Sequence, residues 1–366
     1  MDKVGVGMLG SGFIAEIHVD CFKQIPDAEV RAVAALPEGH PEEFARKHGI
    51  PKHFSDYRKL LELDEVDVIT IGIPNDLHCQ VTVDAASAGK HVICEKPLCI
   101  NLAEADRMIK ACQDAGVKLM YAEELCFAPK YVRCKELTDE GALGQVYMLK
   151  QCEKHDGPHM PWFWDVERSG GGVTMDMGCH AFEFFRWVLG KPKARNVYAE
   201  MDLKVRGDRT KGEDNAIIIV NFEPGPNSVP AGCTCMAEEG WAKMGGMEDR
   251  AEFYGSKGVI YADLLQGTGI TTYSDVGYGY AVEKASTTKG WTFTTYHEAW
   301  NYGFPQEMAH FIDCVQNDKQ PLETGEDGKA ALEIIFAAYH SAATGRRVDL
   351  PFKTEAKKPI ELWLGR

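Results

Sequence analysis

The sequence predicts an α/β protein whose first third forms a doubly wound parallel sheet and whose remainder contains an antiparallel sheet. Short apolar runs alternate with helical patterns from Val4 to Ala122, as parallel strands joined by helical crossovers do. A glycine-rich turn follows the first of these strands. From Lys193 to Leu265, strands separated by Gly, Pro and Asn turns follow one another without helices, which is typical of an antiparallel sheet.

The composition limits the classes of function. The 366 residues suffice for two domains with cores of their own. A net charge of −15 argues against nucleic acid or an anionic membrane surface as a partner. No apolar run reaches the roughly 18 residues that a membrane helix needs, and the N-terminus lacks the basic and apolar regions of a signal peptide. We therefore expect a cytoplasmic protein without a nucleic-acid or membrane partner.

The 12 cysteines are interpreted as reduced thiols of the core. Most lie within apolar runs, as Cys94 and Cys112 do, and no C-x-x-C pair occurs. A zinc site is the alternative, but no recurring Cys/His spacing supports it. We therefore expect no bound metal.

The glycine-rich turn has the pattern of a dinucleotide-binding fingerprint. It lies between a buried strand at Val4–Leu9 and a helix from Phe13 to Phe22. Gly10 permits a tight turn, Gly12 lets the backbone approach a pyrophosphate, and small Ala15 lets the helix pack closely on the strand. The helix N-terminus would then face the phosphates. The structural alternative is a glycine turn in some other α/β protein.

The end of the second strand bears on the choice of cofactor. In the usual pattern, an acidic residue there holds the adenosine ribose hydroxyls. Glu29 to Leu36 is the predicted strand, and the nearest acid, Glu38, comes slightly late. No Arg or Lys stands there to bind a 2′-phosphate, so NAD is favoured over NADP. An exposed loop carboxylate is the alternative interpretation of Glu38.

Polar residues follow several of the later strands. Because ligands bind at the carboxyl ends of the strands in such sheets, we expect these residues to lie near one crevice. Lys96 is the sharpest candidate, since a lysine directly after a buried strand and before Pro97 is suited to proton transfer or to polarising a hydroxyl. A surface lysine paired with Glu95 is the alternative. The residues concerned are Pro74, Asn75, His78, Glu95, Lys96 and Glu123.

The second part of the chain contains a loop, residues 155–165, that is rich in Trp and His. Aromatic faces stack on the C–H faces of sugar rings, while His side chains can hydrogen-bond hydroxyls. A packed lid or a dimer contact is the alternative. The candidate substrate-binding residues of this loop are His155, His159, Trp162 and Trp164.

Asp176 and His180 are four residues apart in an otherwise apolar helical segment that follows Gly170–Gly172. The spacing predicts that both lie on one face of a single helix, and the glycines predict a flexible bend before it. Polar residues in such a setting need partners or a chemical role. A structural Asp–His hydrogen bond and a metal site are the alternatives, although further metal ligands are not evident.

The last third predicts fewer site residues. Glu298 to Gln316 has the pattern of one helix, in which His310 could reach a pocket or serve as a satisfied surface histidine. Thr271 to Thr295 is polar with Gly and Tyr, and we expect a mobile insertion or an interface arm there. The tail from Lys353 carries Trp363, which could dock on a neighbouring chain.

Four motifs together resemble those of the glucose–fructose oxidoreductase / inositol dehydrogenase (Gfo/Idh/MocA) family. They are Gly10–Ala15, Pro74-Asn75 with His78, Glu95-Lys96-Pro97, and Gly170–His180. The resemblance implies an N-terminal Rossmann domain, a C-terminal α/β domain with an open, mostly antiparallel sheet, and NAD(P)-dependent oxidation or reduction of a sugar or cyclic polyol. It makes Lys96, Asp176 and His180 the expected catalytic trio. The expected cofactor-binding residues are Gly10, Gly12, Phe13, Ile14, Leu36, Glu38, Pro74, Asn75, His78, Glu95 and Lys96, and the expected substrate contacts are Lys96, Glu123, His155, His159, Trp162, Trp164, Asp176 and His180.

The leading hypothesis is hydride transfer between nicotinamide and a ring secondary hydroxyl of a sugar or glycoside, such as C3 of a glucosyl unit. Dehydrogenation of inositol or a free sugar is an alternative, and so is glycoside cleavage by a retained NAD without net redox change. A non-enzymatic NAD(H)-sensing protein is a third class. We expect a Rossmann domain at residues 1–124, a substrate-binding domain at 125–366, and a homo-oligomer, dimer or higher, formed through the C-terminal sheet.

Overall fold

The computed structural model describes residues 3–36, 39–265, 270–295 and 297–365. The chain forms two compact units. The first contains residues 1–124 and 304–332, and the second contains residues 125–303 and 333–366. The first of these segments ends at Glu124. Residues 304–332, which the sequence assigned to the second domain, belong to the first unit because their helix packs on the helix of the glycine-rich turn.

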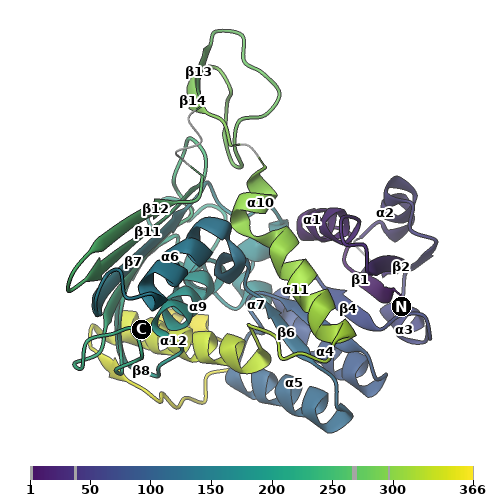
Figure 1. Ribbon diagram of the computed structural model, residues 1–366, viewed down its shortest axis with the longest axis horizontal. Helices are drawn as coiled ribbons and strands as arrows, with labels where there is room; N and C mark the ends of the chain where they lie inside the picture. Colours follow the sequence, from purple (N-terminus) through teal and green to yellow (C-terminus); the bar gives the residue numbers. More distant parts are fainter. Residues whose placement is uncertain (1–2, 37–38, 266–269, 296, 366) are drawn as a thin grey trace. The chain divides into compact units, whose positions relative to one another are not determined.

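The first unit is built on a six-stranded parallel sheet with the order β3-β2-β1-β4-β5-β6. Figure 1 labels β1, β2, β4 and β6 of this sheet. This order has its reversal between β1 and β4, as in the doubly wound fold that the alternating pattern predicted. Its strands are β1 (Val4–Leu9), β2 (Ala28–Ala34), β3 (Lys52–Phe54), β4 (Val68–Ile71), β5 (His91–Glu95) and β6 (Leu119–Ala122). Between and after them lie α1 (Phe13–Phe22), α2 (Pro41–His48), α3 (Tyr57–Leu61), α4 (His78–Ser87), α5 (Leu102–Ala115) and α11 (Phe304–Gln316).

Local signals explain these elements. The four residues of β4 are all buried, as expected for an interior parallel strand covered on both faces. Asp56 caps α3 by accepting a hydrogen bond from the Arg58 amide, and Asn101 caps α5 by accepting one from the Glu104 amide. Gly116 ends α5 in a left-handed conformation.

The second unit contains a seven-stranded sheet with the order β12-β11-β7-β10-β9-β8-β15. Neighbouring strands are antiparallel except for the pair β7 and β10, which is parallel. The prediction of a mostly antiparallel sheet is therefore confirmed. The strands are β7 (Val146–Lys154), β8 (Ala194–Asp202), β9 (Asn215–Phe222), β10 (Thr234–Gly240), β11 (Glu248–Gly255), β12 (Val259–Asp263) and β15 (Val348–Asp349).

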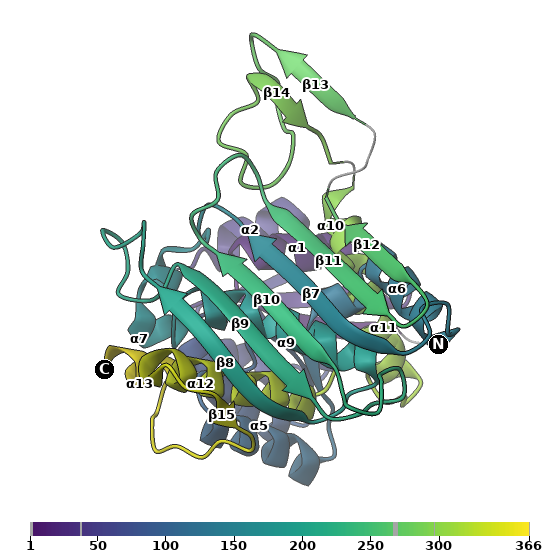
Figure 2. The ribbon, with the colours of Figure 1, turned by 90° about the vertical axis from the view of Figure 1, so that its left-hand side faces the viewer.

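Helices cover one face of this sheet, and the other face is turned toward the viewer in Figure 2. The buried alternate residues of β9, from Ala216 to Phe222, point to the helical side. Phe184 joins this core by an edge-on contact with Phe253 of β11. The helices are α6 (Pro129–Asp139), α7 (Val166–Ser169), α8 (Val173–Asp176), α9 (Gly178–Leu189), α10 (Glu298–Tyr302), α12 (Gly325–Thr344, which begins in the first unit) and α13 (Pro359–Leu364).

The structure adds three details to the prediction for the last third of the chain. The helix expected from Glu298 to Gln316 is two helices, because Gly303 between them has a φ of 96°, which ends α10 in a left-handed conformation. The segment expected to be an insertion contains two paired strands, β13 (Thr271–Ser274) and β14 (Gly290–Phe293), which form the arm at the top of Figure 1. Trp363 is 5% exposed and lies within its own unit.

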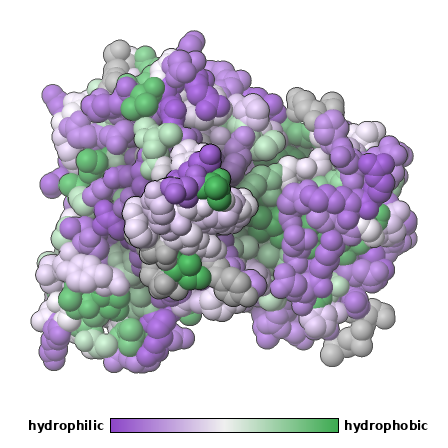
Figure 3. All heavy atoms as spheres, turned by 90° about the horizontal axis from the view of Figure 1, so that it is seen from above, coloured by the Kyte–Doolittle hydropathy of each residue, from purple (hydrophilic) through white to green (hydrophobic). Residues whose placement is uncertain are grey.

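All 12 cysteines are buried and free of disulfides, as the apolar runs around them predicted. Among the residues that the structure describes, no helix has both the length and the apolar character needed to cross a membrane. The face shown in Figure 3 is mainly hydrophilic, with apolar side chains scattered over it in small groups.

Candidate active site

The glycine-rich turn has the geometry that a pyrophosphate requires. Gly10 has a φ of +123°, and a Cβ atom on it would lie 2.2 Å from the carbonyl oxygen of Gly72, so no other residue fits there. Gly12 is the N-cap of α1, and Ala15 of its first turn is buried. The start of α1 therefore offers backbone amides and the positive end of its dipole to an anionic group. These residues fit a dinucleotide.

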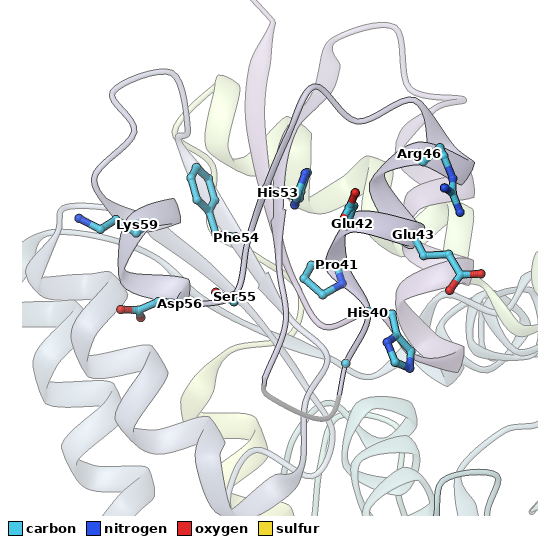
Figure 4. A pocket seen from close by; sticks show the side chains of 11 residues that line it. His40, Pro41, Glu42, Glu43, Arg46, His53, Phe54, Ser55, Asp56 and Lys59 are labelled. Atoms are coloured by element: carbon cyan, nitrogen blue, oxygen red, sulfur yellow. The ribbon is translucent and has the colours of Figure 1, made fainter.

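A pocket of about 870 Å³ lies at the carboxyl ends of β2 and β3, where this fold places the adenosine ribose (Figure 4). Arg46 comes from α2 and Lys59 from α3, both exposed, and three acids share the lining with them. The backbone amide of His40 donates a hydrogen bond to Ser11 Oγ at 3.1 Å, which ties the pocket to the glycine-rich turn. Leu36 precedes this loop and is half-buried; the expected contact at Glu38 lies outside the described residues. The pocket is lined by Gly39, His40, Pro41, Glu42, Glu43, Arg46, His53, Phe54, Ser55, Asp56 and Lys59.

The polar residues expected at the strand ends of the first unit do follow neighbouring strands. Asn75, which is buried, comes after β4, Lys96 after β5 and Glu123 after β6. Because Glu95 pairs with Ala122 across β5 and β6, Lys96 and Glu123 continue two adjacent strands at the same edge. Lys96 is half-buried, whereas Glu123 is fully buried.

The backbone of Lys96 is held by the buried Glu95 carboxyl group, which lies beside His18. Glu95 Oε1 lies 2.9 Å from His18 Nε2, and its Oε2 accepts a hydrogen bond from the backbone amide of Lys96 at 3.1 Å. The other ring nitrogen of His18 lies 2.9 Å from Thr70 Oγ1. Burial opposes the ionisation of Glu95, but the hydrogen bond and charge of His18, together with Lys96, outweigh it and lower its pKa.

His78 was expected to contact the cofactor, and the structure gives it contacts to backbone. Its side chain is fully buried. Nε2 lies 2.8 Å from the carbonyl oxygen of Ile73, and Nδ1 lies 3.1 Å from that of Pro97. His78 thus joins the loop that follows β4 to the loop that carries Lys96.

Several buried carboxyl groups of the first unit lie near Glu307. Glu307 of α11 is fully buried. Burial and the neighbouring carboxylates of Glu124, Glu95 and Glu123 raise the pKa of Glu307 well above its ordinary range. Glu307 and Glu95 are therefore buried acids of the same unit whose pKa values move in opposite directions.

In the second unit, Asp176 and His180 lie on consecutive helices, α8 of four residues and α9 of twelve. Asp176 is the last residue of α8, and His180 is the third residue of α9. Met177 joins them with φ −104° and ψ −34°, and the Asp176 carbonyl accepts a hydrogen bond from the Cys179 thiol. The prediction of one continuous helix is therefore wrong, because the hydrogen-bond pattern changes at this junction. Both residues are buried: Asp176 is 3% exposed and His180 is 1% exposed.

Asp176 is surrounded by aromatic and polar side chains from two strand ends. Trp241, which follows β10, donates a hydrogen bond from Nε1 to Asp176 Oδ2 at 3.0 Å. His155, which follows β7, places Nε2 at 3.9 Å from the same oxygen. Trp164 contacts Trp241 edge-on, with 5.3 Å between ring centroids. Three predicted residues, His155, Trp164 and Asp176, are therefore brought together.

The other members of the Trp- and His-rich loop have different neighbours. His159 Nε2 lies 2.6 Å from Glu283 Oε1. Burial opposes the ionisation of Glu283, but the His159 contact and nearby positive charges outweigh it and lower its pKa. Trp162 stacks on Phe163, with 3.9 Å between the ring centroids.

His310, in the first unit, accepts a hydrogen bond from the Leu322 amide at 2.9 Å, which supports its interpretation as a satisfied histidine.

Sequence reasoning missed two residues that contact candidate site residues: His18, which lies beside Glu95, and Trp241, which donates a hydrogen bond to Asp176. His18 is buried on α1, and the signal was a histidine among the apolar positions of the fingerprint helix. Trp241 is fully buried directly after β10. Its position after a strand was visible, but nothing in the sequence pairs it with Asp176, because 65 residues separate the two.

Comparisons with known proteins agree with this architecture. Residues 4–123 match the oxidoreductase family with an NAD-binding Rossmann fold, and residues 135–350 match the C-terminal α/β domain of the same family. The chain therefore belongs to the Gfo/Idh/MocA family of NAD(P)-dependent oxidoreductases. The class of enzyme predicted from the motifs is confirmed.

Individual relatives show what members of the family act on. Myo-inositol 2-dehydrogenase of Thermotoga maritima is 29% identical over 347 residues, which are 94% of this chain and 98% of that enzyme. Scyllo-inositol 2-dehydrogenase (NAD⁺) of Bacillus subtilis is 26% identical, with 96% and 97% covered. Among solved structures, GenD2 from gentamicin A biosynthesis, in complex with NAD, has a TM-score of 0.89 at 29% identity, with 96% and 97% covered.

Proposed function

We propose that this protein is an NAD-dependent dehydrogenase that oxidises a ring secondary hydroxyl of a sugar unit, with a glycoside as the preferred form and C3 of a glucosyl unit as the preferred position. The observation that carries the proposal is the setting of Asp176. A buried carboxylate that accepts a hydrogen bond from Trp241 at 3.0 Å, beside His155 and Trp164, combines an acceptor for hydroxyl groups with aromatic surface. This combination suits a carbohydrate ring.

We propose that NAD is bound by the glycine-rich turn, the loop after β2 and the Pro74–Asn75 segment. The positive φ of Gly10 and the close approach to Gly72 support the assignment to this turn. When bound, NAD supplies the hydride acceptor. NAD is proposed over NADP because the basic groups of the pocket at β2 and β3, Arg46 and Lys59, share its lining with Glu42, Glu43 and Asp56, which oppose a 2′-phosphate.

We propose the following roles for the chain's own residues. His180 takes the proton from the reacting hydroxyl, since a neutral imidazole is available near pH 7. Lys96 donates a hydrogen bond to that same oxygen and stabilises its developing negative charge. Asp176 orients His180 or binds an adjacent hydroxyl. Glu123 and the aromatic loop contribute further contacts to the ring.

Inositol is the second candidate substrate. It is favoured by the 29% identity to myo-inositol 2-dehydrogenase, which extends over 94% of this chain. A cyclic polyol and a sugar ring offer similar secondary hydroxyls, so the same three side chains would serve both. The relation to GenD2, whose structure holds NAD and has a TM-score of 0.89 to this chain, supports NAD as the cofactor for either substrate.

A substrate panel tests the function. Purified protein with NAD is mixed with inositols, free sugars and glucosides, and NADH formation is followed by absorbance, with NADP in parallel. Reduction of NAD by a glucoside, and a ketone at C3 of the product, is expected. Activity on inositols alone would make the inositol proposal correct instead. Cleavage of a glucoside without net NADH would identify the non-redox reaction, and cofactor binding without any turnover would indicate a sensor.

We also propose that the protein is a homo-oligomer formed through the sheet of the second unit. Several large side chains on this sheet are exposed although they lie on regular strands, and such patches mark interaction surfaces. Light scattering on wild type and on Tyr261→Glu tests this, because a charge at the interface should shift the mass toward the monomer. An unchanged mass would contradict the proposal. The exposed side chains are Tyr147, Ile217, Val259 and Tyr261.

A further inference from the structure

The segment that leads into the helix of Asp176 is held by a buried hydrogen-bond network. Three consecutive backbone amides start this helix, and each has a partner. Gly172 N donates to Tyr339 Oη at 2.9 Å, Val173 N to the carbonyl oxygen of Glu213 at 2.9 Å, and Thr174 N to Glu213 Oε1 at 2.9 Å. These are the amides that a helix leaves without intrahelical partners. Asp176 follows two residues later.

Glu213 and Tyr339 also hold each other. The Tyr339 hydroxyl donates to Glu213 Oε1 at 2.7 Å while it accepts from the Gly172 amide. Both side chains are fully buried. Burial and the Glu213 carboxyl raise the pKa of Tyr339 well above its ordinary range, so the hydroxyl keeps the proton it donates. Burial raises the pKa of Glu213, while the hydrogen bonds from Tyr339 and Thr174 oppose the rise.

The bend before the helix is fixed by contact. A Cβ atom on Gly172 would lie 2.1 Å from the carbonyl oxygen of Glu213, and one on Gly171 would lie 2.2 Å from the Tyr339 hydroxyl. All three residues of Gly170–Gly172 are buried. The expectation of a flexible bend is therefore wrong, because the glycines are required for close packing against Glu213 and Tyr339.

The residue after Glu213, Asp214, contacts the tryptophan that donates a hydrogen bond to Asp176. The carbonyl oxygen of Asp214 accepts the backbone amide of Trp241 at 2.8 Å, and Trp241 then donates from Nε1 to Asp176. The Asp214 carboxylate accepts three backbone amides, from Lys204, Val205 and Arg206, at 2.8, 2.6 and 2.6 Å. The dipeptide Glu213–Asp214 thus fixes both the start of the helix and the tryptophan that contacts its carboxylate.

We infer that Glu213 and Tyr339 are positioning residues for the oxidation, acting through the backbone of residues 172–174 to fix Asp176 and His180 relative to the reacting hydroxyl. This inference rests on the proposed function. Neither residue reacts with substrate. Their effect arises because a misplacement of about 1 Å in a reacting group can lower the rate about 10²-fold.

Four variants test the inference. Glu213→Ala removes the acceptor for Thr174 N, and Tyr339→Phe removes the acceptor for Gly172 N. Glu213→Gln keeps an oxygen at the position of Oε1. Ser341→Ala is the matched control, because Ser341 lies on the same helix, is fully buried, accepts from Ala199 N at 3.0 Å and donates to the Arg346 carbonyl at 2.6 Å. For each variant, kcat, KM, the NAD dissociation constant and Tm are measured.

We expect kcat to fall about 10- to 100-fold in Glu213→Ala and Tyr339→Phe, with KM changed less and with NAD binding within about twofold of wild type, because the proposed NAD residues lie in the other unit. Glu213→Gln should restore most of kcat. Ser341→Ala should lower Tm but leave kcat within about twofold. Hydrogen exchange of the peptide 172–180 should rise in the first two variants and not in the control.

The inference is overturned if Tyr339→Phe and Glu213→Ala keep the wild-type kcat, or if Ser341→Ala lowers kcat as much as they do. Should Glu213→Ala fail to fold, Tyr339→Phe decides, since it removes one hydroxyl and leaves the ring in place. Wild-type protein that oxidises no ring alcohol would refute the proposed function and this inference together. An active wild type with unaffected variants would refute this inference alone.

Discussion

The segments that carry Lys96 and Asp176 are supported in different ways. In the first unit, the Lys96 amide is held by Glu95, whose carboxylate is paired with His18 at 2.9 Å. In the second unit, backbone amides at the start of the Asp176 helix donate hydrogen bonds to the Glu213 carboxyl group and the Tyr339 hydroxyl, and that hydroxyl donates to Glu213 in turn. The Lys96 segment therefore depends on a buried carboxylate beside an imidazole, whereas the Asp176 helix depends on close packing at glycines and on hydrogen bonds to a carboxyl group and a phenol.

The difference shows what a sequence can reveal about a site. Glu95 is the neighbour of Lys96 and was a candidate from the sequence, and His18, which was missed, lies in the fingerprint helix that the sequence did predict. Glu213 and Tyr339 come from a loop and from the last long helix, 39 and 167 residues from their partners. Candidate reacting residues can therefore be predicted from local motifs, whereas the contacts that hold them in place join residues far apart in the sequence and are seen only in the fold.

The largest expected effect is on the group that takes the proton. His180→Ala should lower kcat about 10²- to 10⁴-fold if His180 is the general base. Its folding and NAD binding should persist, because the residues proposed to bind NAD lie in the other unit. Steady-state kinetics on the best substrate of the panel, with NAD binding followed by fluorescence, measures both. Turnover near the wild-type value would remove His180 from the mechanism.

The places of several candidate residues were predictable, while their roles stay predictions. Gly10 and Gly12 indicated a tight turn after β1, because the need for glycine there follows from backbone geometry. Lys96 followed from its position after a buried strand. The break between Asp176 and His180 was not predictable, since it depends on hydrogen bonds around Met177 that leave no mark in the residue spacing. The division at Gly303 was likewise hidden, because a glycine inside a helical pattern can be tolerated or can end the helix.

The next largest effect is on stability and tests the buried contact between His18 and Glu95. His18→Ala leaves the Glu95 carboxylate buried without its partner, so the free energy of unfolding should fall by about 3–5 kcal/mol. Urea unfolding measures it. The double variant His18→Gln/Glu95→Gln removes the buried carboxylate together with its imidazole partner and should lose less stability. Lys47→Ala is the control, because its ion pair with Glu16 is exposed and should contribute less than about 1 kcal/mol. Equal losses of unfolding free energy in His18→Ala and Lys47→Ala would show that the buried contact stabilises the protein no more than the exposed one.

The smallest effect concerns the second buried acid of the first unit, and its sign is opposite to that of Glu95. Because the folded-state pKa of Glu307 is raised, its contribution to stability is full below the unfolded pKa and is lost as pH rises toward the folded value. Glu307→Gln mimics the protonated acid at every pH. The variant should therefore gain stability relative to wild type as pH rises from about 5 to 8, by at most about 1.4 kcal/mol per pH unit.

Urea midpoints of wild type and Glu307→Gln at four pH values in this range measure the difference. Glu16→Gln is the control of opposite sign, because contacts with Lys47 and His48 outweigh the effect of burial and lower the pKa of Glu16. A lowered pKa gives stability that is present above the unfolded pKa and lost as pH falls. A stability difference for Glu307→Gln that stays constant with pH would mean that Glu307 ionises as easily in the folded protein as in the unfolded chain. The neighbouring carboxylates Glu95, Glu123 and Glu124 would then have to be held apart from it.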